Sequence, residues 1–252
     1  MIKFALKYIP RPWLIRLSYV VQFFAPVLYG GSRFTDPIDG RSYRKFLPYG
    51  YGGNIRENAL SPGTNSLERH RLMYLYLKRD TDFFTKPQKV LHVAPEQCFY
   101  GRFRKMENLD YTTADLDSPI ADISMDIHDI PFEENTFDVV FCNHVLEHVD
   151  DDQQCMRELC RILKPGGLAI MQVPWIPEQE MTVEDPSIKD PKERERLFGQ
   201  YDHVRKYGKD YSDRLEKAGF KVTRVDMNQE LSKEEFEKYR LPEGEPLYVC
   251  SK

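Results

Sequence analysis

Short apolar runs alternate with amphipathic segments through the second part of the chain. Runs of the kind that forms buried strands occur at Val90–Val93, Tyr111–Asp115, Ile123–Ile127, Phe137–Cys142, Leu168–Val173, Lys221–Met227 and Leu247–Cys250. Apolar residues at helical spacing predict helices over Phe99–Glu107, after Asp150 or Asp151, and over Tyr211–Ala218. Strands and helices that alternate at this spacing indicate an α/β fold with a doubly wound, mostly parallel seven-stranded sheet.

The N-terminal part of the chain lacks this alternation. Residues 1–29 predict a helix, residues 30–65 an irregular insert rich in Gly, Pro and Tyr, and Ser66–Lys78 a second helix. We therefore expect two parts, with residues 1–85 as an N-terminal extension and residues 86–252 as the α/β domain. Within the latter, residues 175–208 form a long insertion after the fifth strand, which suits a lid over the substrate pocket.

Composition narrows the class of protein. The 252 residues suit one large α/β domain with an appendage, and the formal charge of −4 lacks the basic excess of a general nucleic-acid binder. No nucleic-acid partner is therefore expected. The five cysteines form no Cys-x-x-Cys pair, so neither a disulfide framework nor a thiolate zinc site is indicated, and we expect a cytoplasmic protein.

Basic residues accompany the apolar stripe of residues 1–29. Lys3, Lys7, Arg11 and Arg16 precede or flank it, and no acidic residue occurs before Asp36. A basic amphipathic helix can lie on an anionic membrane surface, whereas the same stripe can also pack on the domain behind it. The stripe is too short and interrupted to span a bilayer. Residues 1–29 are thus a candidate for peripheral membrane contact.

Acidic residues dominate the middle of the chain. From Met106 to Met156 the sequence has 14 Asp and Glu and no Lys or Arg, which favours a hydroxyl-rich or cationic ligand over a phosphate-rich one. Asp115 stands at the end of the second predicted strand, where an acidic residue commonly hydrogen-bonds a ribose. Because ligands of such sheets lie across the carboxyl ends of the strands, we expect the site at this edge.

An ordered set of motifs spans roughly residues 89–173. It comprises Asp126, Ile130-Pro131-Phe132, Phe137-Asp138-Val139, Val145-Leu146-Glu147-His148, Glu158, Arg161 and Leu163-Lys164-Pro165-Gly166-Gly167. The set resembles class I S-adenosylmethionine-dependent methyltransferases of the type 11 kind, in particular a bacterial subset with a His-Val-Ala-Pro-Glu first loop. The resemblance implies a Rossmann-like methyltransferase fold, S-adenosylmethionine as cofactor, S-adenosylhomocysteine as product, and a small-molecule or glycan- or lipid-linked acceptor.

The resemblance also implies cofactor-binding residues. Asp115 would bind the ribose, Asp126 with Ile127 the adenine, and Asn143 with His144 the methionine portion.

The first loop departs from the usual family pattern of an acidic residue and three glycines. This chain has His92, Ala94, Glu96 and Cys98 there. His92 and Ala94 would line the cofactor, and Glu96 would replace the missing acid and pair with the methionine ammonium group. Alternatively, Glu96 is a solvated loop residue. The loss of the glycines also leaves open a non-catalytic protein that uses the fold as a binding module.

Three residues are candidates for catalysis at the acceptor. His144 or His203 can take a proton from a nucleophilic hydroxyl, and Arg205 beside His203 can hold an anionic or hydroxylated acceptor. The alternative is that His203 and Arg205 pair with nearby acidic residues, such as Asp202 or Glu195, and pin the loop.

Two sequence patterns resemble zinc-binding motifs. His144-Val145-Leu146-Glu147-His148 matches the H-x-x-E-H motif of a class of zinc metalloproteases, but it follows a buried strand directly and no long helix follows. Asp36-Pro37-Ile38-Asp39 and Ser61-Pro62-Gly63-Thr64 resemble two zinc-ribbon knuckles in which every thiolate has been replaced. We expect no metal at either place, and a hairpin-like insert held by aromatic residues at the second.

Overall fold

The computed structural model describes residues 11–50, 55–118 and 121–252. The chain divides into two compact units, each built from several segments. The first, here called the sheet unit, comprises Thr85–Pro95, Phe103–Asp226 and Glu245–Lys252. The second, the hairpin unit, comprises Met1–Phe84, Glu96–Arg102 and Met227–Gly244.

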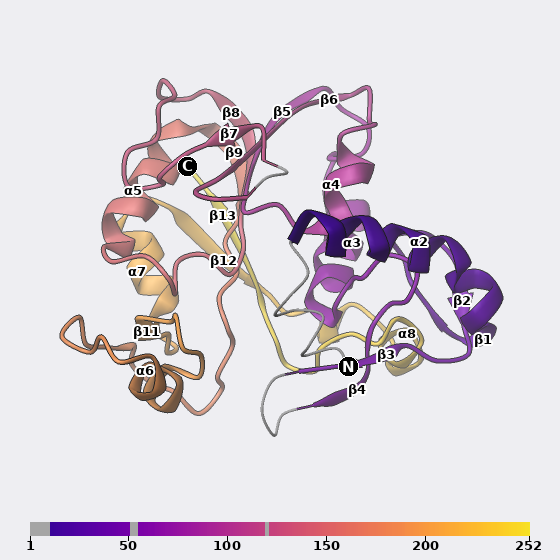
Figure 1. Ribbon diagram of the computed structural model, residues 1–252. Helices are drawn as coiled ribbons and strands as arrows, with labels where there is room; N and C mark the ends of the chain where they lie inside the picture. The colour runs from indigo at the N-terminus through magenta and orange to yellow at the C-terminus, as the bar shows by residue number, and fades with distance from the viewer. Residues whose placement is uncertain (1–10, 51–54, 119–120) are drawn as a thin grey trace. The chain divides into compact units, whose positions relative to one another are not determined.

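A seven-stranded sheet forms the centre of the sheet unit (Figure 1). Its strands, in spatial order, are β12 (Lys221–Val225), β13 (Leu247–Ser251), β9 (Leu163–Ile170), β8 (Phe137–Cys142), β5 (Gln88–Val93), β6 (Leu109–Asp115) and β7 (Ile123–Ser124). The five strands from β9 to β7 run parallel to their neighbours, whereas β13 is antiparallel to both β9 and β12. The predicted mostly parallel seven-stranded sheet is confirmed.

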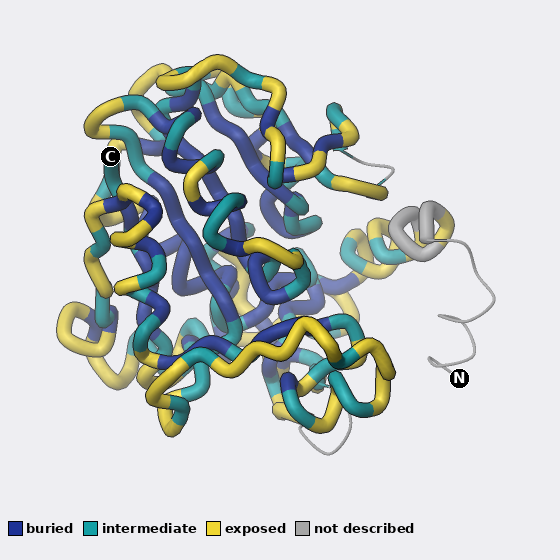
Figure 2. Tube along the Cα trace, turned by 90° about the vertical axis from the view of Figure 1, so that its left-hand side faces the viewer, coloured by how far each residue is buried: buried dark blue, intermediate teal, exposed yellow. Residues whose placement is uncertain are grey.

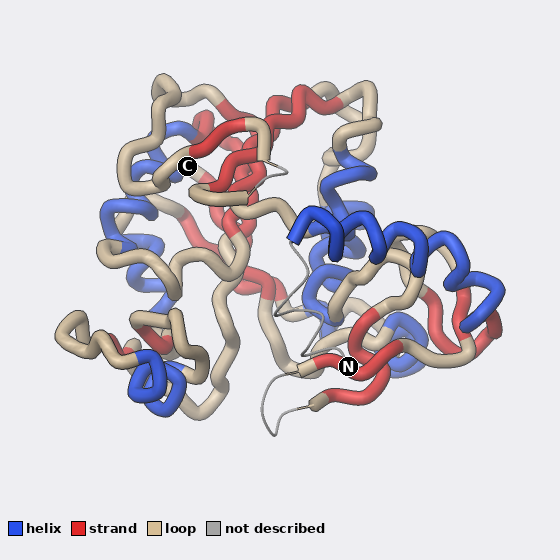
Figure 3. The backbone as a smooth tube through the Cα atoms, viewed as in Figure 1, coloured by secondary structure: helices blue, strands red, loops and turns tan. Residues whose placement is uncertain are grey.

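Two helices of the sheet unit, α5 (Asp152–Ile162) and α7 (Tyr211–Lys217), lie on the same side of the sheet (Figure 3). Of the two residues expected to cap α5, Asp150 and Asp151, the cap is Asp151, whose side chain accepts a hydrogen bond of 2.9 Å from the backbone N–H of Gln154. The apolar faces of these helices and of the central strands form one continuous core. Figure 2 shows the central strands as a block of buried residues, which is what uninterrupted apolar runs in a parallel sheet predict.

The strand after α5 begins earlier than the sequence predicts. The Lys-Pro-Gly-Gly segment was expected to separate the helix from a strand at Leu168–Val173, but β9 begins at Leu163, directly after the helix. Leu163 already pairs with Phe137 of β8, and the next pair is Leu168 with Val139, so the register shifts between these two pairs. Gly166, whose φ is +74°, lies in the segment between Leu163 and Leu168. Glycine takes this left-handed conformation without steric cost, so the ladder passes through the turn residues.

The long insertion after β9 contains little regular structure. A two-residue ladder joins β10 (Val183–Glu184) to β11 (Arg205–Lys206), and between them stands the short helix α6 (Pro191–Phe198). Asp190 accepts two backbone N–H bonds at the start of α6, and Gly199 ends it with φ +91°.

The hairpin unit contains two small antiparallel ladders where an irregular, hairpin-like insert was expected (Figure 3). Its elements are α2 (Arg11–Tyr29), β1 (Gly30–Thr35), β2 (Ser42–Tyr43), β3 (Leu47–Tyr49), β4 (Arg56–Leu60), α3 (Glu68–Asp80), most of α4 (Gln97–Phe103), the 3-10 turn η1 (Met227–Gln229) and α8 (Lys233–Tyr239). Phe34, Tyr43 and Phe46 form a buried aromatic cluster with Ala25 of α2.

The two knuckle-like segments of the hairpin unit meet through hydrogen bonds. Thr64 Oγ1 and Ser66 Oγ both donate to Oδ2 of the fully buried Asp36, at 2.5 and 3.1 Å. Asp39 accepts the hydroxyl of Tyr43 at 2.6 Å. Hydrogen bonds thus join the segments that four thiolates hold in a zinc ribbon.

A buried arginine ties distant segments of the hairpin unit together. The Arg71 guanidinium donates to the carbonyl oxygens of Ala59, Ser66, Tyr239 and Arg240 over 2.7–3.1 Å. Burial lowers the pKa of Arg71 to about 10, which still leaves it charged at neutral pH. These bonds explain why Met227–Gly244 belongs to the hairpin unit rather than to the α/β domain expected over residues 86–252.

Candidate functional site

Three neighbouring parallel strands end at one edge of the sheet unit, and the predicted cofactor residues follow them. β5 pairs with β6 on one side and with β8 on the other, so Val93 lies in register with Ala114 and with Cys142. Ala94, Asp115 and Asn143 are the next residues of the three strands. The structure therefore brings these residues to one edge, as the sequence predicts.

Two of the residues at this edge have an unusual backbone. Ala94 has φ +49° and His144 has φ +55°, both in the left-handed region that residues with a Cβ seldom adopt. Hydrogen bonds hold both residues, from Ala94 N–H to the Ala114 carbonyl at 2.8 Å and from His144 N–H to the Gln172 carbonyl at 2.7 Å. Strained residues of this kind cluster at ligand sites. The first loop thus makes, without glycine, a turn that glycine usually supplies.

Asp115 organises the loop that follows β6. Its Oδ1 accepts the backbone N–H groups of Asp117 and Ser118 at 2.9 and 2.8 Å. Among the described residues no hydrogen bond reaches Oδ2, and the side chain is only partly buried. One carboxylate oxygen thus fixes the loop while the other is left for a ligand hydroxyl.

Asp126 and Ile127 differ in exposure. Asp126 is exposed, and its Oδ1 accepts the backbone N–H of His128 at 2.9 Å and lies 2.7 Å from Nδ1 of the same histidine. These bonds hold the pKa of Asp126 below its usual value. Ile127 is 5% exposed and packs in the core. Asp126 is therefore accessible to an adenine, whereas most of the Ile127 side chain faces the core.

His92 lies within β5 and is fully buried. Its Nδ1 is 2.7 Å from the hydroxyl of Tyr111, and its ring lies edge-on to Phe141. These contacts give His92 a packing role inside the sheet, and its contact with the cofactor stays a prediction. Glu96 belongs to the hairpin unit, so its pairing with a ligand ammonium group stays a prediction.

Asn143 and Gln172 connect the ends of three strands. Asn143 is 6% exposed, and its Oδ1 accepts the backbone N–H of Gln172 at 3.3 Å. The Gln172 side chain in turn donates to the Pro246 carbonyl and accepts the N–H of Tyr248, at 3.1 and 2.7 Å. This network fixes the backbone from which His144 projects.

The residues after His144 form a turn. No helix is assigned between Asn143 and Asp151, so His144 and His148 do not share a helix face as the metalloprotease motif requires. Instead, His144 Nδ1 faces Glu147 Oε1 at 3.3 Å. Glu147 is 1% exposed. Burial opposes its ionisation, but the hydrogen bond from His144 and the charges of His144 and His148 outweigh burial and lower the pKa of Glu147.

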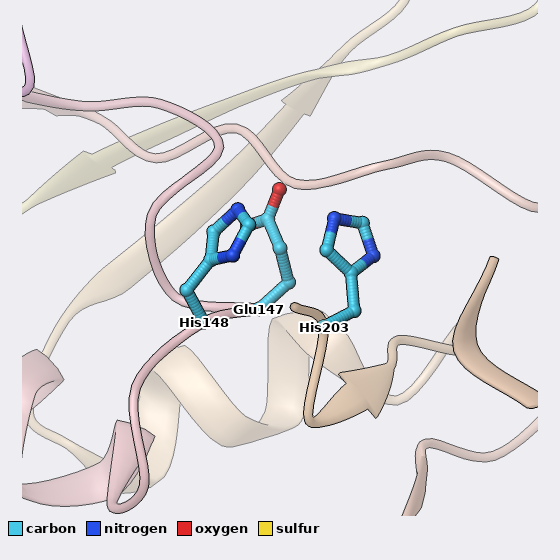
Figure 4. A group of neighbouring side chains, drawn as sticks. All are labelled: Glu147, His148 and His203. Carbon is cyan, nitrogen blue, oxygen red and sulfur yellow. The ribbon is translucent and has the colours of Figure 1, made fainter. Parts of the chain in front are cut away.

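His203 lies beside this turn. The backbone N–H of Val204 donates to the Glu147 carbonyl at 2.9 Å, and the rings of His203 and His148 meet edge-on with centroids 4.8 Å apart. Figure 4 shows Glu147, His148 and His203 grouped with their polar atoms toward one another. Sequence reasoning did not join His203 to Glu147, because the two belong to irregular segments 56 positions apart.

Arg205 has a different role from the one expected. It is 3% exposed, and its guanidinium donates to Glu184 Oε2 at 2.9 Å. The same group donates to three carbonyl oxygens of the turn, those of Leu146, Val149 and Asp150, at 2.7, 2.5 and 2.8 Å. All its nitrogen atoms are therefore engaged by the protein. Arg205 positions the turn after β8, which agrees with the alternative of a pinned loop, although its partners are not the acidic residues considered from the sequence.

A second buried carboxylate, which the sequence did not single out, completes this network. Asp152 accepts two hydrogen bonds from Arg214, at 3.0 and 2.7 Å, and one from the Tyr207 hydroxyl at 2.8 Å. Burial opposes the ionisation of Asp152, but the Arg214 hydrogen bond and the charge of Arg205 outweigh it and lower the pKa of Asp152. A cavity of about 410 Å³ lies against Asp152, Arg205 and Arg214. Its charged lining suits a polar ligand.

Comparison with known proteins gives a family for part of the chain. Residues 102–171 match the family model described as "Methyltransferase domain". This match confirms the resemblance to class I methyltransferases that the motifs indicate.

Curated relatives match over short stretches. A ubiquinone/menaquinone biosynthesis C-methyltransferase of Idiomarina loihiensis is 37% identical over 49 residues, which are 19% of this chain and 20% of that protein. A 37.1 kDa protein in a transposon of Streptomyces fradiae is 32% identical over 87 residues, 34% of this chain and 22% of that protein. The chain thus spans about a fifth of the length of these relatives.

Among solved structures, phosphoethanolamine N-methyltransferase 2 of Haemonchus contortus in complex with S-adenosyl-L-methionine is similar with a TM-score of 0.45 and 16% identity. The match covers 64% of this chain and 39% of that chain.

Proposed function

We propose that this chain, whose residues 102–171 match the methyltransferase-domain family, transfers a methyl group from S-adenosylmethionine to a small-molecule or glycan- or lipid-linked acceptor. The observation that carries the proposal is the edge formed by β5, β6 and β8. There Ala94, Asp115 and His144 follow adjacent parallel strands, in the part of the sheet where such folds bind ligands.

The residues at this edge fit the cofactor. Oδ2 of Asp115, which has no hydrogen-bond partner among the described residues, can accept a hydrogen bond from a ribose hydroxyl, and the first loop begins with a left-handed turn at Ala94, which has a small side chain. The exposed Asp126 carboxylate can accept a hydrogen bond from the exocyclic amino group of an adenine. When bound, S-adenosylmethionine supplies an electrophilic methyl group on sulfur, so the chain has to hold the acceptor in line with it.

His144 is the better placed of the two histidines proposed as proton acceptors. Its Nδ1 faces the Glu147 carboxylate at 3.3 Å, which favours a proton on Nδ1 and leaves Nε2 as the basic nitrogen. Nε2 is buried and has no hydrogen-bond partner among the described residues. Because His144 directly follows Asn143 at the cofactor edge, this nitrogen can take a proton from an acceptor hydroxyl there.

A calorimetric titration with S-adenosylmethionine tests the proposal. Asp115→Asn keeps a side-chain oxygen for the loop bonds but loses the carboxylate, so we expect cofactor binding to weaken by about 1–3 kcal/mol, roughly 5–150-fold. Asp110→Ala is the matched control, because Asp110 is exposed at the opposite end of the same strand. Failure of the intact, folded chain to bind S-adenosylmethionine would refute the proposal.

A non-catalytic binding module remains the second candidate, motivated by the glycine-free first loop. It also predicts cofactor binding, but no production of S-adenosylhomocysteine with any acceptor. A product assay over pools of small-molecule, glycan and lipid-linked acceptors separates the two, with His144→Ala as the variant that should lose turnover and keep cofactor affinity.

We further propose that α2 contacts an anionic membrane surface. Its large apolar side chains are exposed, among them Trp13 at 61%, Phe23 at 77% and Val27 at 84% (Figure 2). Lys3 and Lys7 lie outside the described residues, as do the side chains of Arg11 and Arg16. The sequence has basic residues and no acidic residue before Asp36, so the positive charge of this N-terminal segment complements anionic lipid. None of the described helices is long and apolar enough to cross a bilayer.

Sedimentation with vesicles tests the membrane contact. The chain should bind vesicles that contain anionic lipid more strongly than purely zwitterionic ones, and Phe23→Glu should reduce binding by 10-fold or more, an order of magnitude that corresponds to burying one aromatic side chain. Leu116→Glu is the control, because Leu116 is 62% exposed in the sheet unit. Equal loss in both variants, or no binding by the unchanged chain, would contradict the contact.

A further inference from the structure

Glu147, His148 and His203 bring three potential ligand atoms together. One atom of each side chain lies within 4.8 Å of the other two. Glu147 and His148 come from the turn after β8, and His203 comes from the loop before β11. The hydrogen bond from Val204 N–H to the Glu147 carbonyl fixes the two segments to each other. The cluster therefore has a rigid backbone frame.

The Glu147 carboxylate lacks a partner for one of its oxygens. Oε1 faces His144, whereas Oε2 is buried and receives no hydrogen bond from the described residues. A carboxylate oxygen removed from water without a donor or a cation is costly, so buried carboxylates are paired or bind metals. In Figure 4 the Glu147 carboxyl group stands between the two imidazole rings. A cation among these side chains would satisfy Oε2.

His203 has the outer contact that metal-binding histidines commonly show. Its Nδ1 lies 3.2 Å from the Phe198 carbonyl, whereas His148 Nδ1 faces Asp202 Oδ2 at 3.6 Å, beyond hydrogen-bond distance. A proton held on Nδ1 of His203 by the carbonyl leaves its Nε2 as the free donor atom.

We propose that Glu147, His148 and His203 bind one divalent transition-metal ion, and that their chemistry fits Zn²⁺. Two imidazoles and one carboxylate form the ligand set of open zinc sites, in which the fourth position is left for water or substrate. Ligand atoms around a tetrahedral zinc ion are about 3.3 Å apart when the bonds are about 2.0–2.1 Å. The present spacing of up to 4.8 Å therefore has to contract, and the partly exposed His148 ring can make that movement.

The proposed site departs from the metal-free chain that the sequence predicts. That prediction considered the two knuckle-like segments without thiolates and the H-x-x-E-H pattern, in which His144 and His148 bind zinc and Glu147 acts as a base. In the proposed site Glu147 is itself a ligand, His144 orients it, and His203 is the third ligand. If the proposed transferase function holds, the open fourth position is also a place for an acceptor oxygen.

Metal titration of the full chain tests the site. Chelator-treated protein should bind close to one equivalent of Zn²⁺ by calorimetry, and Co²⁺ should give the visible absorption of a four-coordinate ion. The melting temperature should rise with the Zn²⁺ concentration, because the metal binds the folded chain. Glu147→Gln, which keeps the side-chain volume, and His148→Ala should each weaken binding by at least about 100-fold, the upper loss seen even for outer-contact mutations.

Control variants distinguish metal binding by this cluster from the loss of any histidine and from unfolding. His128→Ala removes a histidine that contacts Asp126 outside the cluster, so it should keep full Zn²⁺ affinity. Circular dichroism and melting of each variant show whether it is folded. Absence of stoichiometric Zn²⁺ binding by the folded, unchanged chain, or undiminished affinity in the two ligand variants, would overturn the site. A parallel S-adenosylmethionine titration of His148→Ala should be unchanged, so failure of the metal site and failure of the transferase proposal are distinguishable.

Discussion

Replacement of Arg205 by alanine tests whether this side chain holds the protein or the acceptor. In the structure its guanidinium is buried and donates hydrogen bonds to three carbonyl oxygens of the turn after β8 and to the Glu184 carboxylate. Arg205→Ala leaves those oxygens without their donor and leaves Asp152 with one cation fewer nearby. The variant should therefore lose stability rather than one specific ligand contact.

The magnitude follows from the number of groups left unsatisfied. About 1 kcal/mol for each of the three carbonyl oxygens gives roughly 3 kcal/mol, and the partly exposed Glu184 adds at most about 1 kcal/mol. The sum, about 4 kcal/mol, agrees with the cost of removing one partner of a buried ion pair. For a chain of this size it corresponds to a fall of roughly 10 °C in the melting temperature.

Thermal melting and urea unfolding of the purified variant measure this loss. Arg196→Ala is the matched control, because Arg196 lies on the same insertion and its side chain is 66% exposed in a pair with Glu193. Its melting temperature should stay at the wild-type value. If Arg205→Ala melts within about 2 °C of wild type and yet loses acceptor turnover, the positioning role is wrong and Arg205 faces the acceptor.

Three further outcomes follow from single positions. Ala94→Gly should raise the free energy of unfolding by about 0.5 kcal/mol, because relief of the left-handed strain exceeds the entropy cost of glycine; a lower melting temperature would contradict it. Since the folded-state pKa of Asp152 lies below the unfolded value of about 3.9, its stabilisation is present above that pH and is lost as the pH falls through the lowered pKa. Urea midpoints should thus fall more steeply in acid for wild type than for Asp152→Asn, and parallel curves would count against this. In Gly208→Ala the new Cβ would lie 2.5 Å from the Met181 backbone, so the free energy of unfolding should fall by about 1–3 kcal/mol. Gly101→Ala is the control, because the space around Gly101 is open and its replacement should not destabilise the chain. Equal melting temperatures of the two variants would refute the clash.

The strands of the parallel sheet were predictable because a strand that is buried on both faces has a nearly continuous run of apolar residues. Phe137–Cys142 was predicted with the bounds that β8 has, and the start of α5 was predicted at Asp150 or Asp151, of which Asp151 is the cap. The observed ends of helices and strands differ from the predicted ends where the pattern of apolar residues does not mark an end. The helix expected over Phe99–Glu107 runs from Gln97 to Phe103, and the segment of Gly166 enters the β9 ladder because backbone pairing, not side-chain pattern, extends it.

The candidate site was predictable only as far as strand order places it. Asp115 and His144 follow strands, so their meeting at one edge could be derived from topology. His92 could not be separated from them, because a polar residue inside a strand looks the same whether it meets a ligand or Tyr111. The cluster with His203 and the bonds of Arg205 depend on how an irregular insertion folds back on a turn, and no periodicity encodes that.

The place of β13 in the sheet has a consequence for the order in which the chain can fold during synthesis. β12 leaves the ribosome before β13, yet in the sheet it touches β9 only through β13, which stands between them. Between the two strands the ribosome also makes Met227–Gly244, which completes the hairpin unit. A nascent chain that ends before Leu247 therefore carries β12 without its neighbour and leaves the outer edge of β9 unpaired. Such an open edge can pair with other chains, so β13 also protects the nascent protein from aggregation once it is made.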